Sequence, residues 1–160
     1  MKSTTLKLIE RPAQIVVGLL IHTKPMSPQI PALWPRFVSR LGEIANANEP
    51  RVSYGVMTHD AVPEMVLHYM AAVSVSAAGK VPNGMTSLTL PAGSYAVFSY
   101  PLSGLGRGFG EIFDRLMPAS GHVQIAGQPI FERYDAAFDP ANPASAVEIY
   151  LPVRARAATP

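Results

Sequence analysis

Two short segments near the end of the sequence each place a carboxylate two residues from a tyrosine. Glu132 and Tyr134 form the first pair, and Glu148 and Tyr150 form the second. Both segments have the composition of β-strands, and alternate side chains of a strand point to the same face. Each glutamate is therefore predicted to share a face with its tyrosine. A carboxylate beside an aromatic wall is a suitable receptor for a flat organic cation.

Glu132 is the first candidate for a functional site. Its predicted strand also carries Ile130, and an ionised carboxylate among apolar side chains is costly unless it is paired, protonated or kept for a ligand. The alternative is that Glu132 lies at a solvated sheet edge or pairs with an arginine. For Glu148 the alternative is simpler, because Val147 and Ile149 belong to an apolar face and the glutamate then faces solvent.

Composition limits the class of protein. The chain has 160 residues, of which 48% are hydrophobic and 15% are charged, as expected for one folded domain or two small halves that share a core. The net charge of +2 comes mostly from dispersed arginines and gives no argument for direct nucleic-acid binding. No signal sequence or segment long enough to span a bilayer is found, so we expect a cytoplasmic protein without membrane contact.

The sequence does not indicate a metal or a cofactor. Cysteine is absent, which excludes a disulfide scaffold, a thiolate nucleophile and a thiolate-bound metal. The four histidines, His22, His59, His68 and His122, lack the spacing of metal ligands. His68 is expected on a strand face, where it is more often a core or pocket-wall residue than a catalyst.

Glycines at positions 104, 106, 108 and 110 precede a second predicted helix. Bare backbone N–H groups at a helix start can bind phosphate. The spacing matches neither G-x-G-x-x-G nor a Gly-Lys-Ser/Thr ending. We interpret the series as a flexible loop at the mouth of a ligand cleft.

The predicted elements occur twice in the same order. Residues 6–76 and 86–153 each read strand, helix, strand, strand, and a turn signal at Pro82–Gly84 separates them. The first helix is predicted from Ile30 to Ile44 by apolar residues at helical spacing. Each half is too small to bury a good core alone, so the halves are expected to associate and to leave a cleft between them.

Two further predictions concern single positions. Trp34 is expected at the cleft side of the first helix, because Phe37, Leu41 and Ile44 already supply its core stripe. Residues 154–160 are expected to form a frayed tail.

The chain resembles the GyrI-like small-molecule-binding family, which also occurs as the effector domain of AraC- and MerR-type transcription regulators. The resemblance covers nearly the whole chain, as a single domain over residues 1–160. Its more specific motifs are GSYAVF at 93–98, LMPASG at 116–121, PIFERY at 129–134 and VEIYLPV at 147–153, with weaker matches in VVG at 16–18 and YGV at 54–56.

The resemblance implies an α+β fold in which two β-α-β-β units are related by a pseudo-twofold axis, with antiparallel sheets and a cleft that takes hydrophobic, often cationic, compounds. The acidic cleft position of the family falls on Glu132, and a later acidic position falls on Glu148. Trp34 and Tyr69 are assigned by their placement in the matching helix and strand. Because no DNA-binding region is present, a stand-alone module is expected.

Three functions follow as hypotheses. The first is a binding protein for hydrophobic or cationic small molecules, used in multidrug or toxin sensing or sequestration. Its expected ligand-binding residues are Glu132, Tyr134, Glu148, Tyr150, Trp34, Tyr69 and His68. The second is a hydrolase of the kind found in some relatives, which opens reactive cyclopropane rings, with Glu132 as general base and Tyr134 as proton donor. The third is a module that binds a protein partner such as DNA gyrase.

Overall fold

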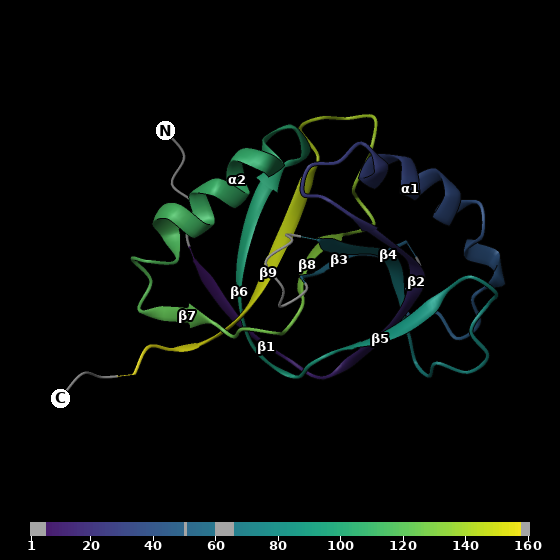
Figure 1. Ribbon diagram of the computed structural model, residues 1–160, viewed down its shortest axis with the longest axis horizontal. Helices are drawn as coiled ribbons and strands as arrows, with labels where there is room; N and C mark the ends of the chain where they lie inside the picture. The colour runs from purple at the N-terminus through teal and green to yellow at the C-terminus, as the bar shows by residue number, and fades with distance from the viewer. Residues whose placement is uncertain (1–5, 50, 60–65, 158–160) are drawn as a thin grey trace.

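The computed structural model describes residues 6–49, 51–59 and 66–157. This part of the chain contains nine β-strands and two α-helices (Figure 1). The strands are β1 (Lys7–Arg11), β2 (Gln14–Thr23), β3 (Ser53–His59), β4 (Leu67–Val75), β5 (Thr86–Leu90), β6 (Gly93–Pro101), β7 (His122–Gln124), β8 (Ile130–Tyr134) and β9 (Ala146–Ala155). The helices are α1 (Gln29–Val38) and α2 (Leu105–Glu111), and none of the helices in the described residues is long and apolar enough to cross a bilayer.

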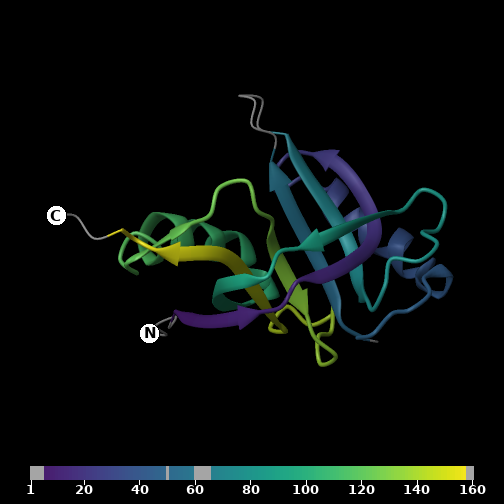
Figure 2. The same cartoon turned by 90° about the horizontal axis from the view of Figure 1, so that it is seen from below.

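The strands form one antiparallel sheet that curls into a half-barrel (Figure 2). Its order is β1-β6-β9-β8-β3-β4-β2-β5, and β7 pairs with the far end of β9. Both helices lie on the same side of the sheet, outside the curl (Figure 1). The predicted α+β fold with antiparallel strands is confirmed.

The first strand of each half pairs with the sheet of the other half. β1 pairs with β6 so that Arg11 lies opposite Gly93, and β5 pairs with β2 so that Leu90 lies opposite Gln14. A Pro-Ala dipeptide follows both Arg11 and Leu90, and proline cannot continue the hydrogen-bond ladder of a strand. In each half, the chain therefore leaves an edge strand at its Pro-Ala dipeptide and continues in a strand next to the opposite edge of the sheet.

These reciprocal pairings relate β2 to β6 by an approximate twofold rotation. The fifth residues of these strands are Gly18 and Val97, and they pair with Ala72 on β4 and Tyr150 on β9. β4 therefore corresponds to β9, and Ala72 corresponds to Tyr150. The sheet order reads alike from both ends, which is the pseudo-twofold arrangement that the resemblance implied.

The same correspondence locates the axis. Tyr54 on β3 pairs with Ala72, and Phe131 on β8 pairs with Tyr150, so Tyr54 and Phe131 are equivalent. The residues that follow them, Gly55 and Glu132, are then also equivalent, and they pair directly with each other across the β3–β8 ladder. The pseudo-twofold axis therefore passes between Gly55 and Glu132.

Apolar side chains cover both faces of the sheet, as expected for central strands. The inner face, inside the curl, holds one core cluster that includes Tyr54, Phe131 and Tyr150. The face that carries the helices, called here the helix face, holds two: one packs α1 through Leu33 and Phe37, and the other packs the region of α2. The space between these two clusters contains the site described below.

Helix α1 is shorter than predicted. It ends at Val38 instead of Ile44, and a separate 3-10 turn follows at Leu41–Glu43. Gly42, a poor helix former, stands in that turn, and Pro35 inside α1 cannot donate a backbone hydrogen bond. Leu41, predicted to belong to the core stripe, is accordingly 36% exposed.

The predicted flexible glycine loop is wrong, because most of this segment is helical. Helix α2 spans Leu105–Glu111 and continues as a π-helical turn at Ile112–Leu116. A Cβ at position 108 would lie 2.7 Å from the ring of Tyr100, so Gly108 allows the helix to approach β6 closely. Here glycine supplies close packing rather than flexibility.

The first residues of the predicted frayed tail are paired. Arg154 and Ala155 belong to β9 and pair with β7, a short strand that the sequence did not indicate. The Arg156 N–H also donates to the Gly121 carbonyl at 2.9 Å. Residues 158–160 lie outside the described part of the chain.

Candidate functional site

A cavity of about 720 Å³ opens on the helix face between the two halves. The first half contributes the turn before α1, Trp34 of α1, Met57 of β3 and Tyr69 of β4, among others. The second half contributes the start of α2, with Leu105, Gly106, Phe109 and, beyond the helix, Phe113, and the residues Ile130, Glu132 and Tyr134 of β8. This volume lies within the range of small-molecule sites in proteins.

Glu132 is the charged group of the cavity. Its residue surface is only 5% exposed. The hydroxyl of Tyr69 donates to Glu132 Oε1 at 2.9 Å, and that of Tyr134 donates to the same oxygen at 2.6 Å. Among the described residues, no lysine or arginine forms an ion pair with Glu132, and Oε2 accepts no hydrogen bond. The second oxygen is therefore available to a ligand.

Burial governs the protonation of this cluster. Desolvation raises the pKa of the Glu132 carboxyl, and the hydrogen bonds from Tyr134 and Tyr69 oppose the rise only in part. Burial and the neighbouring carboxylate also raise the pKa of the Tyr69 and Tyr134 hydroxyls. Both tyrosines are thus neutral hydrogen-bond donors at physiological pH.

A chain of hydrogen bonds fixes the orientation of these groups. The Trp34 indole N–H donates to the Tyr69 hydroxyl at 3.2 Å, and Tyr69 donates in turn to Glu132. The Trp34 ring also makes an edge contact with the ring of Tyr134, with centroids 5.3 Å apart. The side chains of Trp34, Tyr69 and Tyr134 therefore surround the carboxylate.

Gly55 provides the space that this cluster occupies. A Cβ at this position would lie 2.3 Å from the Tyr69 hydroxyl and 2.5 Å from Glu132 Oε1, closer than real Cβ atoms approach other atoms. Because Gly55 and Glu132 face each other across the pseudo-twofold axis, the axis carries one carboxylate and, opposite it, one missing side chain. The side chains of the site therefore break the pseudo-twofold symmetry of the backbone at the axis itself.

The structure brings together four of the seven residues that the sequence assigned to ligand binding. Glu132, Tyr134, Trp34 and Tyr69 all line the cavity. Ile130, Glu132 and Tyr134 share one face of β8, as the alternation predicted.

The other three residues do not line this cavity. Phe131 and Arg133, on the inner face, pair with Tyr150 and Glu148, so these two residues of β9 point away from Glu132. The assignment of Glu148 and Tyr150 to the same cleft is therefore corrected: each glutamate shares a face with its tyrosine, but the two pairs lie on opposite faces. His68 precedes Tyr69 on β4 and also faces away from the cavity.

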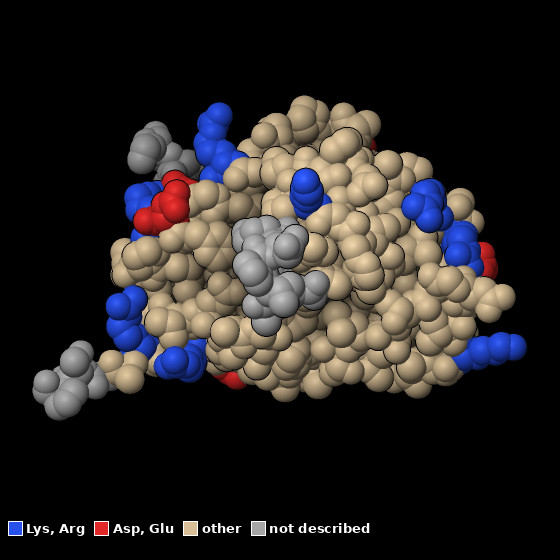
Figure 3. All heavy atoms as spheres, in the orientation of Figure 1, with Lys and Arg blue, Asp and Glu red and all other residues tan. Residues whose placement is uncertain are grey.

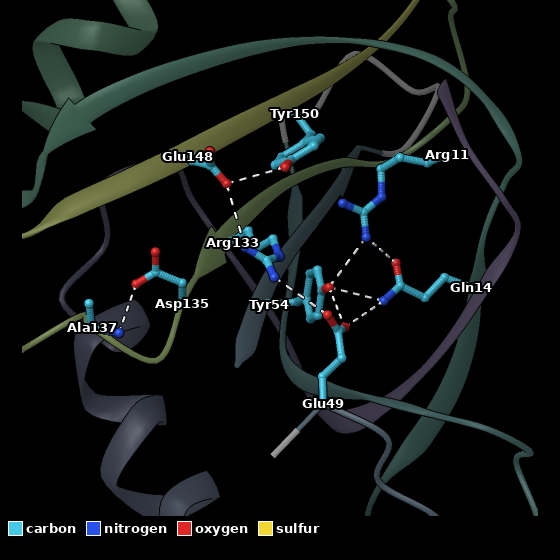
Figure 4. A network of polar contacts seen from close by, with 9 residues as sticks. All are labelled: Arg11, Gln14, Glu49, Tyr54, Arg133, Asp135, Ala137, Glu148 and Tyr150. Carbon is cyan, nitrogen blue, oxygen red and sulfur yellow. Dashed lines mark hydrogen bonds and ion pairs between the residues drawn. The ribbon is translucent and has the colours of Figure 1, made fainter. Parts of the chain in front are cut away.

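Glu148 and Tyr150 belong to a polar network on the inner face (Figure 4). The Tyr150 hydroxyl donates to Glu148 at 3.2 Å. The Arg133 guanidinium lies 3.6 Å from Glu148 and 3.4 Å from Glu49, and Arg11 lies over the Tyr150 ring at 5.0 Å from its centroid. Here the carboxylates have cationic partners within the protein.

His68 packs its ring against His22 at a centroid separation of 4.4 Å. Within the ranges that the structure describes, no group of three or more histidine, aspartate or glutamate side chains could hold a metal ion. The side chain of His59 lies outside the described part of the structure.

Sequence reasoning missed several residues that the cavity uses. Met26, Met57 and Phe109 carry no signal beyond their hydrophobicity, which is equally typical of core residues. Gly55 appears in the weakly matching YGV motif, but its role depends on the register between β3 and β8, which one strand alone does not specify.

A curled antiparallel sheet with an apolar cavity and one buried carboxylate is the arrangement of a small-molecule-binding domain. The chain belongs to the GyrI-like family: the model of the GyrI-like small molecule binding domain matches residues 4–154. The chain is also similar to the transcriptional regulator BrlR of Pseudomonas aeruginosa, with 35% identity over 150 residues that make up 92% of this chain and 54% of the regulator. It thus spans about half the length of that relative.

Solved structures show the same fold. SAV2435 bound to tetraphenylphosphonium has a TM-score of 0.74 and 18% sequence identity, and the match covers 94% of each chain. The C-terminal domain of EcmrR has a TM-score of 0.67 and 16% identity, with 95% of this chain and 98% of that domain covered.

Proposed function

We propose that this domain binds hydrophobic organic cations, in order to sense or sequester them, with Glu132 as the counter-charge. The observation that carries the proposal is a carboxylate that is 5% exposed, lies in a cavity of about 720 Å³ and has no cationic partner among the described residues. An ionised buried group of this kind is costly to the protein alone. A guest cation would supply the missing charge.

The walls of the cavity support a hydrophobic ligand. Apart from Glu132 and its hydroxyl donors, the cavity is lined mainly by proline, methionine, leucine, isoleucine and aromatic side chains. Rings that surround a cation contribute cation–π attraction, and this attraction is larger when the ion is desolvated. On the face shown in Figure 3, most of the Lys, Arg, Asp and Glu side chains of the described residues lie toward the periphery.

The comparison with SAV2435 supports the same ligand class. That protein binds tetraphenylphosphonium, a cation whose charge is covered by four phenyl groups and which cannot donate a hydrogen bond. Such a ligand depends on Coulomb attraction and apolar contact, and both are available around Glu132.

The arrangement favours binding over hydrolysis. The tyrosine hydroxyls that would protonate a leaving group are already donated to Glu132, at 2.9 Å and 2.6 Å, and their raised pKa makes them weak acids. Stoichiometric binding without product is therefore expected. Release of an altered compound during incubation would identify the enzyme instead, and purification with a large protein partner would support an interaction module.

The test uses the single tryptophan, Trp34, as a reporter. Titration with tetraphenylphosphonium is expected to change its fluorescence and to saturate. Glu132→Gln keeps the shape of the side chain and removes its charge. Loss of a buried charge partner typically costs 2 kcal/mol or more, so the affinity should fall by about 30-fold or more.

Two controls isolate the role of charge. Triphenylphosphine oxide is neutral and carries three phenyl groups in place of four, and its affinity should change far less than that of the cation in Glu132→Gln. Glu148→Gln removes a carboxylate from the inner face and should leave tetraphenylphosphonium binding unchanged. Equal weakening of the cation and the neutral compound, or equal effects of the two substitutions, would contradict the proposal.

A further inference from the structure

The turn before α1 places an unusual residue at the mouth of the cavity. The Ser27 N–H donates to the Lys24 carbonyl at 3.2 Å, with Pro25 and Met26 as the two central residues. Met26 has a φ of 63°, the left-handed region that such turns normally reserve for glycine. This conformation is unfavourable for a residue that carries a Cβ. An observed departure of this kind suggests that the side chain has a function.

The Met26 side chain reaches across the mouth to the other half of the molecule. A Cβ placed on Gly106 would lie 2.8 Å from Met26 Cε and 3.6 Å from Sδ. Gly106 belongs to the first turn of α2, and both residues line the cavity. The thioether therefore bridges the gap between the turn before α1 and the start of α2.

Met26 is also the most exposed of the large hydrophobic residues that line the cavity. Its residue surface is 78% exposed, the highest value among the exposed large hydrophobic residues of the described chain. The neighbours Pro25 and Pro28 have fixed φ angles, whereas methionine has three flexible side-chain bonds and adapts to different partners. An exposed, flexible apolar side chain thus lies at the mouth between stiffer segments.

We propose that Met26 is a gate that sets how quickly, and up to what size, a ligand enters the cavity. The side chain swings away from Gly106 to admit a guest and then returns across the mouth. The absence of a side chain at Gly106 leaves room for the closed position. This inference rests on the proposed function for its ligand, but the gate can also be observed without one.

The first test measures access to Trp34 in the unliganded protein. Collisional quenching of Trp34 fluorescence by acrylamide should increase in Met26→Ala, because the mouth stays open. Met26→Leu restores bulk without sulfur and should return quenching to the wild-type level. Alanine at position 26 keeps the same φ requirement as methionine, so the backbone strain is matched. Val38→Ala removes another exposed apolar side chain, from α1 but away from the cavity, and should have no effect.

The second test measures the rates of tetraphenylphosphonium binding by stopped-flow fluorescence. In Met26→Ala, association and dissociation should both become faster by about tenfold, which corresponds to about 1.4 kcal/mol in the barrier. The dissociation constant should change little, because a gate affects both directions equally. The smaller triphenylphosphine oxide should show less acceleration.

The outcomes separate the gate from the proposed function. Faster dissociation with unchanged association would mean that Met26 is only a wall contact, and unchanged rates would overturn the gate directly. If wild-type protein does not bind tetraphenylphosphonium at all, the proposed function fails. The quenching experiment still tests the gate in that case, because unchanged quenching of Trp34 in Met26→Ala would show that Met26 does not control access to the cavity.

Discussion

The two faces of β8 treat charge in opposite ways. On the helix face, Glu132 is almost fully buried and accepts hydrogen bonds from Tyr69 and Tyr134, without an ion pair in the described chain. On the inner face, the next residue, Arg133, lies between Glu49 and Glu148, whose side chains are 29% and 33% exposed. The inner face balances its charges internally, and the helix face leaves one charge for a guest.

The difference shows which face is suited to binding a cation. Partly exposed ion pairs contribute little free energy of unfolding, typically below about 1 kcal/mol. A buried carboxylate without a counter-ion is unfavourable for the folded protein. The helix face therefore carries a cost that is offset only when a ligand arrives, and the following predictions test that asymmetry.

The largest effect is expected from Gly55→Ala. The new Cβ would overlap the Tyr69 hydroxyl at 2.3 Å and Glu132 Oε1 at 2.5 Å, and Tyr69 is too deeply buried to move freely. Overpacking of this kind costs about 1–3 kcal/mol, so the melting temperature should fall and cation binding should be lost. Gly110→Ala, where no atom lies within 4 Å of the added Cβ, should be neutral or slightly stabilising. Normal binding by Gly55→Ala would mean that the cluster is not formed as described.

A smaller effect is expected from Tyr134→Phe. It removes the donor that lies 2.6 Å from Glu132 Oε1, and without that donor the pKa of the carboxyl rises further. Because hydrogen bonds to charged groups contribute about 1.5–3 kcal/mol, tetraphenylphosphonium affinity at neutral pH should fall by about tenfold or more. Tyr150→Phe removes the matching hydroxyl from the inner face and should change the affinity less than about twofold. Calorimetric titration of both variants gives the comparison, and equal losses would argue against the difference between the faces.

The smallest effect concerns stability as a function of pH. Burial raises the pKa of Glu132 above its unfolded value, so the folded chain holds this proton more tightly. The resulting stabilisation is complete below the unfolded pKa, about 4.3, and is lost as pH rises through the folded pKa. Unliganded Glu132→Gln, which mimics the neutral form, should melt a few degrees higher than wild type at neutral pH.

This difference should become small near pH 4, where most of the glutamate is protonated in both states. Melting temperatures measured by circular dichroism between about pH 4 and pH 8 provide the check. A variant that is less stable than wild type at neutral pH would show that the ionised carboxylate is better solvated than its burial indicates.

Much of the candidate site follows from local patterns in the sequence. The two-residue period of a strand placed Glu132 and Tyr134 together, and helical spacing placed Trp34 at the edge of the apolar stripe of α1. The alternating, largely apolar run that became β4 indicated a central strand, and β4 does lie between β3 and β2. These are predictions about one element at a time, for which periodicity is sufficient.

The remaining features depend on relations between elements. Alternation groups Glu148 with Tyr150, but only the register of β8 against β9 shows that both face away from Glu132. In the same way, Gly108 reads as a loop residue until the ring of Tyr100 is seen against it. Met26 was not singled out, because its importance lies in a turn geometry and a contact with a residue 80 positions away.

The position of Glu132 on the pseudo-twofold axis has a consequence for how such a site could originate. In a homodimer built from two identical half-chains, any residue on the axis faces its own copy. A glutamate there would meet a second glutamate, and two adjacent carboxylates cannot both ionise readily; a glycine would meet a glycine and leave no charge. The two positions can differ only where the two halves are not identical, as in this single chain. The single carboxylate opposite Gly55 is thus a property that a symmetric dimer of identical half-chains could not encode.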